Sequence, residues 1–208
     1  MIPDESVHPM NETLETISKR HSVRTFARQD ISDDDIQMLL EAANNAPSAH
    51  NQQPWRFIVT QGEKKQELAH LVTTKSYGFP KPASSLLRMA ARSIISAPLV
   101  IALANTGELI EHGTHLFKVE KRMAYDFFRT MEIQSSAAAA QNLLLAATSL
   151  GLSTVWLGIL FLIKDEVLQF FGEPKGEFMA VIPVGYAARP SKGPQKMPVE
   201  KKVRYLKD

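Results

Sequence analysis

A short basic segment near the start of the chain has the residue types that bind a phosphate group. The stretch KRHSVRTF, residues 19–26, surrounds the Ser22 hydroxyl with four possible cations: Lys19, Arg20, His21 and Arg24. Arginine side chains match the geometry of phosphate oxygens, and a hydroxyl can donate a further hydrogen bond. A basic turn exposed to solvent explains the same spacing equally well. The segment therefore indicates an anion site without establishing one.

A second polar segment, APSAHNQQPW at residues 46–55, places five hydrogen-bonding side chains between two prolines: Ser48, His50, Asn51, Gln52 and Gln53. The segment follows a predicted helix and precedes a predicted strand. Amide and hydroxyl groups in such a loop can hydrogen-bond the edge of a flat heterocyclic ligand. An ordinary polar loop is the alternative.

Most familiar catalytic patterns are missing from the sequence. It contains no GxGxxG, GxxxxGK[ST], HExxH or GxSxG motif. The absence of cysteine excludes disulfides, thiolate metal ligands, cysteine nucleophiles and iron–sulfur clusters. His112 and His115 form the only close histidine pair, and exposed loop histidines explain that spacing more simply than a metal site. No metal is therefore expected, and a cofactor bound by backbone and basic side chains fits better.

Length and composition indicate an ordinary folded protein. The chain has 208 residues, enough for one domain over residues 1–208 with a sizeable core. Hydrophobic residues make up 44% and charged residues 22%, near globular averages. A net charge of +2 argues against bulk attraction to nucleic acid. The N-terminal sequence lacks the basic and apolar regions of a signal peptide, so a cytoplasmic location is expected.

One uncharged segment, residues 135–163, is long enough to span a bilayer. Polar residues interrupt it, and Gly151 followed by Leu152 is typical of a Schellman stop at a helix C-terminus. We therefore expect a buried helix over residues 133–150, followed by a strand or extended segment over STVWLGI. A helix that is apolar on all faces must be enclosed by protein, and a dimer core is one such setting. A membrane span is the alternative.

The remaining hydrophobic pattern predicts a mixture of helices and strands. Ser32 and Asp35 have the spacing of a helix N-cap and an acidic third residue. Helices are predicted over residues 11–19, 33–45, 63–72 and 115–130, and strands over 55–60, 98–104 and 178–187. The basic tail KGPQKMPVEKKVRYLKD is too polar to form a core, so we expect it to lie on a surface, either its own or a partner's.

Together, the two polar segments resemble the opening of the nitroreductase family of FMN enzymes. The family pattern runs R-[RH]-S-x-[RK]-x-F, then a helix, then P-S-x-x-N-x-Q-P-W. Here the matching residues are Arg20, His21, Ser22, Arg24 and Phe26, then Pro47, Ser48, Asn51, Gln53, Pro54 and Trp55. The stretches AAQNLLLAATSLGLSTVWLG, residues 139–158, and VGYA, residues 184–187, are also similar to the family. The resemblance covers nearly the whole sequence.

This resemblance implies an α+β fold with a central, mostly antiparallel sheet flanked by helices. It also implies a homodimer with two FMN sites at the interface and C-terminal tails exchanged between subunits. The implied activity is ping-pong hydride transfer, in which NAD(P)H (NADH or NADPH) reduces the flavoprotein and a nitroaromatic, quinone or similar small acceptor reoxidises it. The cofactor carries the chemistry, so no residue is assigned a catalytic role.

Similarity to the family also implies roles for individual residues. One group lies at the phosphate, ribityl and pyrimidine side of FMN: Arg20, His21, Ser22 and Arg24. A second group reaches the flavin from the other subunit: Pro47, Ser48 and Asn51. A third group faces or flanks the isoalloxazine ring, with the Gly158 N–H near flavin N5: Ser135, Trp156, Leu157 and Gly158. Lys196 and Arg92 are further candidates for the phosphate.

Alternatives within and outside the family stay open. A specialised relative, such as a reductive dehalogenase, a flavin-cleaving enzyme or an azoline-oxidising enzyme, would share the same motifs. A non-enzymatic flavin-binding protein or a membrane-associated protein is a third class. Ala49 and Ile159 depart from the family pattern at the acceptor pocket. Residues 73–96 and 105–130 are expected to form the lid that selects the acceptor.

Overall fold

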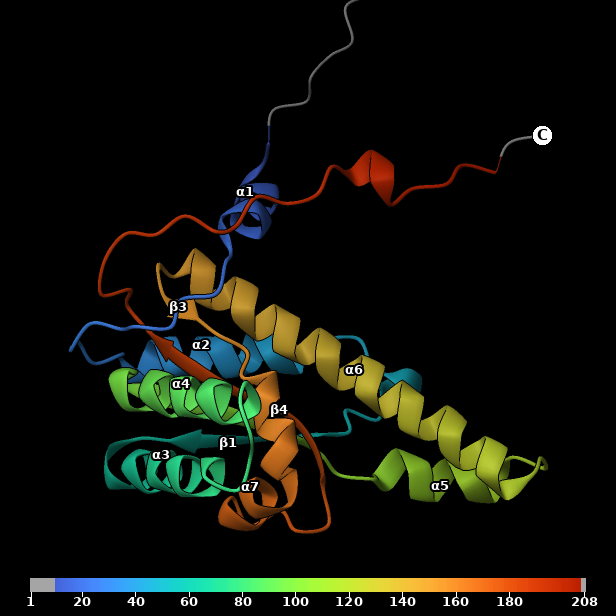
Figure 1. The fold of residues 1–208 in the computed structure, drawn as a ribbon. Helices are drawn as coiled ribbons and strands as arrows, with labels where there is room; N and C mark the ends of the chain where they lie inside the picture. Colours follow the sequence, from blue (N-terminus) through green and yellow to red (C-terminus); the bar gives the residue numbers. More distant parts are fainter. Residues whose placement is uncertain (1–9, 207–208) are drawn as a thin grey trace, which may run out of the picture.

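The computed structural model describes residues 10–206, which form a four-stranded sheet with helices on both faces (Figure 1). The strands are β1 (Trp55–Thr60), β2 (Leu99–Asn105), β3 (Ser153–Thr154) and β4 (Glu177–Gly185). They lie in the order β1-β2-β4-β3, and every neighbouring pair is antiparallel. This arrangement confirms the predicted antiparallel sheet flanked by helices, and the three long strands lie within two residues of the predicted ranges.

The central strand β2 divides the core into two layers. Its seven residues are all buried, and they alternate between two hydrophobic clusters as a strand requires. Leu99, Ile101 and Leu103 belong to one cluster, whereas Val100, Ala102 and Ala104 belong to the other. The sheet is therefore covered by apolar side chains on both faces.

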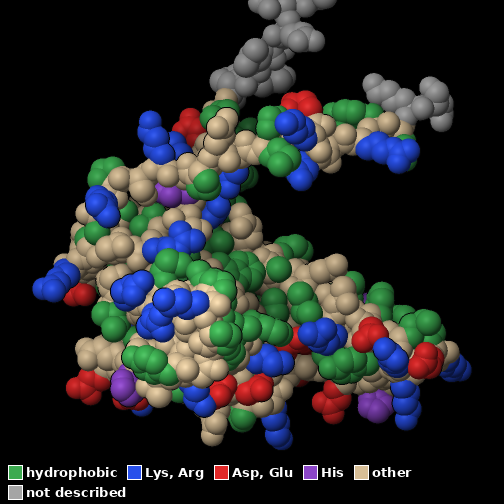
Figure 2. All heavy atoms as spheres, in the orientation of Figure 1, with side chains coloured by type: hydrophobic (Ala, Val, Ile, Leu, Met, Phe, Trp, Pro, Cys, Tyr) green, Lys and Arg blue, Asp and Glu red, His purple; other side chains and the backbone are tan. Residues whose placement is uncertain are grey.

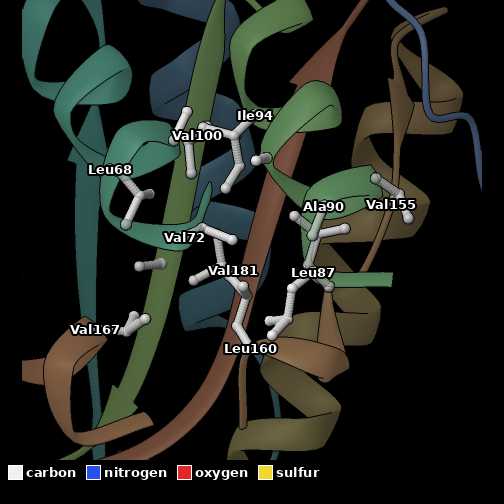
Figure 3. Packing of buried hydrophobic residues seen from close by; sticks show 14 of the residues in the cluster. Leu68, Val72, Leu87, Ala90, Ile94, Val100, Val155, Leu160, Val167 and Val181 are labelled. Atoms are coloured by element: carbon white, nitrogen blue, oxygen red, sulfur yellow. The ribbon is translucent and has the colours of Figure 1, made fainter. Parts of the chain in front are cut away.

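Helices α3 (Gly62–Ser76) and α4 (Ala83–Ser96) cover one face of the sheet. Figure 3 shows Leu68 and Val72 of α3 packed with Leu87, Ala90 and Ile94 of α4 against Val100 and Val181. Leu87, Ala90, Ala91 and Ile94 of α4 recur at helical spacing and are almost fully buried. The expectation that residues 73–96 form a free lid is therefore wrong for α4, which is part of the core.

Helices α2 (Asp33–Asn44) and α6 (Lys121–Ser149) cover the other face. The predicted cap of α2 is confirmed, because the Asp35 N–H donates to Ser32 Oγ at 3.1 Å. The predicted stop after α6 is also confirmed. Gly151 has φ +74°, its N–H donates to the Thr148 carbonyl, and the Leu152 N–H donates to the Ala147 carbonyl, which completes a Schellman motif.

Two predicted helices, 115–130 and 133–150, prove to be wrong in their boundaries. The chain instead forms α5 (Glu108–Leu116), a short turn, and the single 29-residue helix α6. No proline or glycine lies between residues 121 and 150, so nothing in the sequence interrupts α6. The break falls earlier, where Phe117 packs edge-on against Phe128 with ring centroids 4.9 Å apart. This contact folds α5 back onto α6.

The uncharged segment continues past α6 as an extended chain along β4. Val155 and Leu157 donate their N–H groups to the carbonyls of Pro183 and Val181. The 3-10 helix η2 (Gly158–Ile163) and helix α7 (Lys164–Phe170) follow. No helix within residues 10–206 is both long enough and apolar enough to cross a bilayer.

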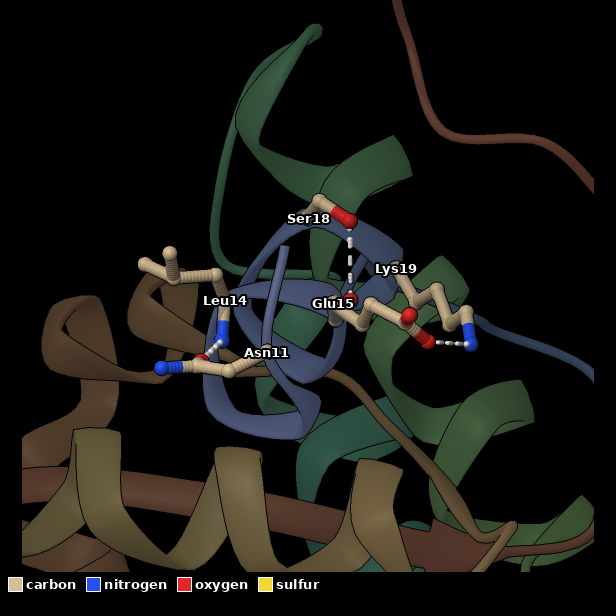
Figure 4. Close-up of polar contacts among 5 residues, drawn as sticks. All are labelled: Asn11, Leu14, Glu15, Ser18 and Lys19. Carbon is tan, nitrogen blue, oxygen red and sulfur yellow. Dashed lines mark hydrogen bonds and ion pairs between the residues drawn. The ribbon is translucent and has the colours of Figure 1, made fainter. Parts of the chain in front are cut away.

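The two ends of the described chain lie at the periphery. Helix α1 (Glu12–Lys19) has a side-chain cap from Asn11 and an ion pair between Glu15 and Lys19 (Figure 4), yet it buries no residue. After β4 the chain runs past α1 as an exposed tail that contains the short helix η3 (Val199–Lys201). Figure 2 shows basic and hydrophobic side chains together along this projecting arm. This confirms that the tail is too exposed to form part of the core.

Candidate functional site

Main-chain hydrogen bonds hold the basic segment in place between β3 and the start of the tail. The Val23 N–H donates to the Thr154 carbonyl at 2.9 Å, and Ser22 forms a parallel bridge with Thr154. On the other side, the Ala27 N–H donates to the Tyr186 carbonyl at 2.8 Å, and the Ala188 N–H donates to the Thr25 carbonyl at 3.1 Å. The segment therefore pairs with the neighbouring chain through isolated bridges and does not form a full strand.

The side chains of this segment divide into buried apolar and exposed polar groups. Val23 and Phe26 are 8% and 5% exposed and pack into the α3/α4 cluster. Ser22 and Arg24 are exposed, and Arg20 is half-buried. Among residues 10–206, no carboxylate lies within 4.0 Å of either arginine or of Arg92 or Lys196. These cations are therefore available to an anionic ligand.

A cavity of about 170 Å³ lies beside Arg24. Its walls come from α4 and the segment that follows β3: Leu86, Met89, Ala90, Ser93, Val155, Trp156, Leu157, Gly158 and Ile159. The predicted Arg24, Trp156, Leu157 and Gly158 thus meet at one cavity, whereas Arg92 and Lys196 are not among its lining residues. The contribution of α4 was missed because that helix was not predicted, although its apolar spacing was visible in the sequence.

This cavity fits one part of a flat, largely apolar ligand with an anionic or polar end. It is smaller than the roughly 300–1,000 Å³ of a complete small-molecule site. Its walls are mostly apolar, and Arg24 supplies the charge. Gly158 is exposed, and the space where a Cβ would lie has no heavy atom within 4 Å, so a ligand can approach the backbone there. The residues present therefore fit a ring system such as that of a flavin.

The second polar segment forms a loop with unusual backbone geometry. His50, Asn51 and Gln53 have φ values of 53°, 54° and 49°, which is the left-handed region that residues other than glycine rarely adopt. Hydrogen bonds within the loop hold this shape. The Gln53 N–H donates to Ser48 Oγ at 3.0 Å, and Gln53 Nε2 donates to the Asn51 carbonyl at 3.1 Å. Strain of this kind persists only where the surroundings enforce it.

Ser135 of α6 anchors the same loop from below. Its hydroxyl accepts a hydrogen bond from the Ala49 N–H at 3.2 Å and donates to the Met131 carbonyl at 2.7 Å. The side chain is 5% exposed, and its single proton is already used. The structure therefore gives Ser135 a supporting role under the loop, and its place facing the flavin stays a prediction.

The two predicted halves of the site do not meet within one subunit. The residues that line the Arg24 cavity do not include Pro47, Ser48 or Asn51. The resemblance had implied that these three reach the flavin from another subunit, and the separation is compatible with that prediction.

His21 is not among the residues that line the cavity, and its side chain contacts the tail. Its Nδ1 lies 2.9 Å from the Lys19 carbonyl, and its Nε2 lies 2.8 Å from Ser191 Oγ. Both ring nitrogens therefore have protein partners. The prediction that His21 contacts FMN remains a prediction.

A separate buried carboxylate lies one turn before Ser135. Glu132 is fully buried, and its Oε1 accepts hydrogen bonds from the Leu109 N–H at 2.9 Å and the Ile110 N–H at 3.4 Å. Burial raises the pKa of Glu132, and these backbone hydrogen bonds only partly oppose the effect. The carboxylate thus takes the place of a side-chain cap at the N-terminus of α5. Sequence reasoning missed this residue, because position 132 fell between the two predicted helices, 115–130 and 133–150.

The histidines of residues 10–206 do not form a metal-binding group with other side chains. His112 lies on α5 and, with His50, lines a small cavity of about 140 Å³. Among residues 10–206, no group of three or more histidine, aspartate or glutamate side chains is placed to hold a metal ion.

Comparison with known proteins gives this geometry a family context. The model of the nitroreductase family matches residues 17–186. A protein of Archaeoglobus fulgidus, provisionally named an NADH dehydrogenase/NAD(P)H nitroreductase, is 31% identical over 150 residues, covering 72% of this chain and 69% of that one. An NADPH-flavin oxidoreductase of Vibrio harveyi is 28% identical over 169 residues, covering 80% of this chain and 61% of that one.

A solved structure agrees in fold. The crystal structure of a nitroreductase from Desulfitobacterium hafniense, determined with bound FMN, has a TM-score of 0.70 and 25% identity, and the match covers 95% of this chain and 100% of that one. The family match covers both polar segments, the cavity walls and the whole sheet. The chain belongs to the nitroreductase family.

Proposed function

We propose that this protein is an FMN-dependent oxidoreductase that uses NAD(P)H to reduce a small acceptor such as a nitroaromatic compound or a quinone. The observation that carries the proposal is the apolar cavity beside Arg24, with further unpaired cations on the segment that leads to it. The FMN held by the Desulfitobacterium hafniense relative supports the choice of cofactor. The NAD(P)H-dependent names of the other relatives support the choice of reductant.

The residues of this chain would bind and orient the cofactor. When bound, FMN would accept a hydride from the nicotinamide and pass reducing equivalents to the acceptor. Arg20, Ser22 and Arg24 would hold its phosphate and polar edge through charge-assisted hydrogen bonds. The apolar wall formed by Val155 and Leu157 would exclude water from one side of the ring. No side chain is required as an acid or base, so we assign none.

We further propose that the working form is a homodimer. Pro47, Ser48 and Asn51 would complete the site from the second subunit. Helix α1 exposes Leu14 and Ile17 by 50% and 48%, and the tail exposes Val203 and Leu206 by 40% and 83%. Side chains of this kind are seldom left in water when they lie together, and a second copy of the chain would cover them.

Identification of the cofactor is the direct test. The purified protein should show flavin absorbance, and chromatography of the released cofactor should give FMN. The basic residues address one terminal phosphate, and the sequence has no dinucleotide fingerprint. Release of FAD, or no flavin uptake at any concentration, would contradict the proposal.

Replacement of Arg20 by alanine tests the anion site. Loss of one charge-assisted contact, worth about 1.5–3 kcal/mol, should weaken FMN binding by roughly ten- to hundredfold in a fluorescence titration. Arg56→Ala is the matched control, because Arg56 lies on β1 and pairs with Glu173 at 3.4 Å. Equal affinity of wild type and Arg20→Ala would mean that the basic segment is only a solvated turn.

Truncation after Tyr186 tests the shared interface. The truncated protein should lose both the dimer and FMN, because Lys196 and the exposed tail contacts are removed together. Sedimentation and flavin stoichiometry measure the two losses. A monomer that keeps one FMN per chain would refute the shared site.

The acceptor has to be found by experiment. Steady-state oxidation of NADH and of NADPH should be followed with a panel of nitroaromatic compounds, quinones and enones. Turnover with none of them would favour a specialised relative or a non-enzymatic flavin-binding protein. Consumption of the flavin itself in air would favour the flavin-cleaving alternative.

A further inference from the structure

A second large cavity lies where the starts of α5, α7 and β4 meet the first half of α6 (Figure 1). Its volume of about 420 Å³ is within the range of roughly 300–1,000 Å³ of small-molecule sites. It shares no lining residue with the Arg24 cavity, and none of the residues assigned to FMN lines it. We call it the Glu132 cavity, and six charged side chains line it: Arg129, Glu132, Lys164, Asp165, Lys175 and Glu177.

Two cations that line the Glu132 cavity have no ion-pair partner. Arg129 forms an ion pair with Glu177, which uses one cation and one carboxylate. Among residues 10–206, no carboxylate lies within 4.0 Å of Lys164 or Lys175. Lys164 Nζ instead lies 5.1 Å from the centroid of the Phe161 ring. Two ammonium groups are therefore available to a ligand in this cavity.

The Glu132 carboxyl group has one oxygen without a hydrogen-bond partner. Its Oε1 accepts from the Leu109 and Ile110 N–H groups, whereas its Oε2 is buried and makes no hydrogen bond. Burial raises the pKa of Glu132, which favours the protonated carboxyl group. Because Oε1 already accepts two hydrogens, the proton of the neutral group belongs on Oε2. A buried O–H donor without an acceptor is costly, so this group fits an oxygen atom of a ligand.

A second buried donor without a partner lies at the same end of the sheet. Among residues 10–206, the buried side-chain atoms that make no hydrogen bond are Glu132 Oε2 and Asn105 Nδ2. Ser136, one turn beyond Glu132 on α6, donates to Asn105 Oδ1. Asn105 also pairs in register with Glu177, which lines the cavity. Both groups without a partner therefore lie where the cavity is, and both can donate.

We propose that the Glu132 cavity is a separate binding site for a small oxygen-bearing dianion, such as a dicarboxylate or a phosphate ester. Lys164 and Lys175 would pair with its two negative charges, and the Glu132 carboxyl group would donate to one of its oxygens. A cationic ligand would face two lysines without ion-pair partners, with the exposed Asp165 as its main partner. The proposal does not depend on the function proposed above.

Isothermal titration calorimetry of the purified protein with succinate and with hydrogen phosphate tests the site. At least one of the two dianions should bind saturably, with one ion per chain, whereas neutral succinamide should not bind. Binding of succinate alone would support a dicarboxylate site, and binding of phosphate alone would support a phosphate-ester site. Absence of binding by both dianions, or equal binding of succinamide, would overturn the proposal.

Lysine substitutions locate the bound dianion. Lys164→Met and Lys175→Met should each weaken binding by about three- to tenfold, as expected for loss of one contact. Lys64→Met is the matched control, because Lys64 lies on α3, pairs with Glu67 at 2.6 Å and does not line the cavity. Arg20→Ala removes a cation of the basic segment, the other candidate anion site. Loss of binding in Arg20→Ala, with none in the two cavity variants, would overturn the proposal.

Glu132→Gln tests the buried carboxyl group, with sulfate as a probe that remains a dianion from mildly acidic to neutral pH. Wild-type affinity should fall as pH rises, because the carboxyl group loses its donor proton. The glutamine variant keeps an N–H donor, so its affinity should change less. Both proteins share the other titratable and charged side chains of α6, α7 and β4 that line the cavity, and α5 contributes none: Tyr125, Arg129, Lys164, Asp165, Lys175 and Glu177. Parallel pH curves would overturn the role given to Glu132.

Discussion

The basic segment and the polar loop carry the two halves of the proposed site, but different forces hold them. The basic segment is extended and is fixed by main-chain hydrogen bonds to Thr154, Tyr186 and Ala188. The loop after α2 has three left-handed residues and is fixed by the side chains of Ser48 and Ser135. The backbone shape of the basic segment therefore depends little on which exposed side chains it carries. The backbone shape of the loop depends on particular side chains.

This difference separates binding from folding in the two halves. In the basic segment, Arg20 and Arg24 are free to bind a ligand because the backbone holds its shape without them. In the loop, a change of one hydroxyl should alter the geometry of its neighbours. Helix α6 supports the loop side, since Glu132 and Ser135 lie one turn apart and hold α5 and the loop respectively.

The largest expected effect on stability is at Phe26, the buried side chain that anchors the basic segment in the core. Phe26 is 5% exposed, and a Cβ built on Gly185 would lie 3.2 Å from its ring. Phe26→Ala should lower the free energy of unfolding by about 3–5 kcal/mol in urea denaturation. The neighbouring Thr25 is exposed, so Thr25→Ala should leave the free energy of unfolding within about 0.5 kcal/mol of the wild-type value. Similar losses for the two variants would show that packing does not seat this segment.

Ser135→Ala should have the next largest effect, on the loop side. The substitution leaves the partly buried Ala49 N–H without its acceptor, at a cost of about 1–3 kcal/mol. Thr130→Ala is the control on the same helix, because Thr130 donates to a carbonyl four residues back but supports no loop. The comparison uses urea denaturation together with FMN titration. A loss no greater than that of the control would remove Ser135 as an anchor.

Elements were predictable where a local signal marked their ends. The cap at Ser32 and the stop at Gly151 gave correct ends for α2 and α6 because each motif acts within one turn. Helix α4 was missed even though its apolar residues have helical spacing, because it lies between two prolines and carries little charge. The break between α5 and α6 depends on contacts between Phe117 and Phe128, which local patterns do not contain.

The site was predictable as a set of residues but not as an arrangement. Similarity to a family pointed to Arg24, Trp156, Leu157 and Gly158, which meet at one cavity. The pattern could not show that Ser135 points beneath the loop or that His21 points to Ser191. Both features depend on side-chain direction across segments far apart in sequence. The residues of α4 that line the cavity could be identified only from the three-dimensional structure.

Glycine substitution should have opposite signs in the two segments. His50 has φ 53°, so His50→Gly removes left-handed strain and should raise the free energy of unfolding by up to about 1 kcal/mol. Thr25 lies in the extended segment, where glycine relieves no strain and only raises the conformational entropy of the unfolded chain. Thr25→Gly should therefore lower the free energy of unfolding by about 0.5–1 kcal/mol. Urea denaturation measures both. Changes of the same sign would show that the loop geometry is not strained.

The smallest effect should be a pH dependence on the side supported by α6. Burial raises the pKa of Glu132 above its ordinary value of 4.5, so the folded protein holds this proton more tightly than the unfolded chain. Below pH 4.5 both states are protonated and the contribution to stability is complete. As pH rises through the raised pKa, the unfolded chain releases the proton more readily, and the contribution is lost.

Glu132→Gln isolates this contribution because the amide oxygen can still accept from the Leu109 and Ile110 N–H groups but does not titrate. The stability of the wild type relative to this variant should fall as pH rises from 4.5 toward neutrality, as measured by thermal melts at each pH. Glu166→Gln should show the reverse trend, since a hydrogen bond from Lys75 lowers the pKa of Glu166 and its contribution disappears as pH falls. A wild-type curve parallel to that of Glu132→Gln would mean that the carboxylate is ionised in both states. An ionised Glu132 would then stabilise the N-terminus of α5 by its negative charge. The stability of the loop half of the site would no longer depend on pH through this residue.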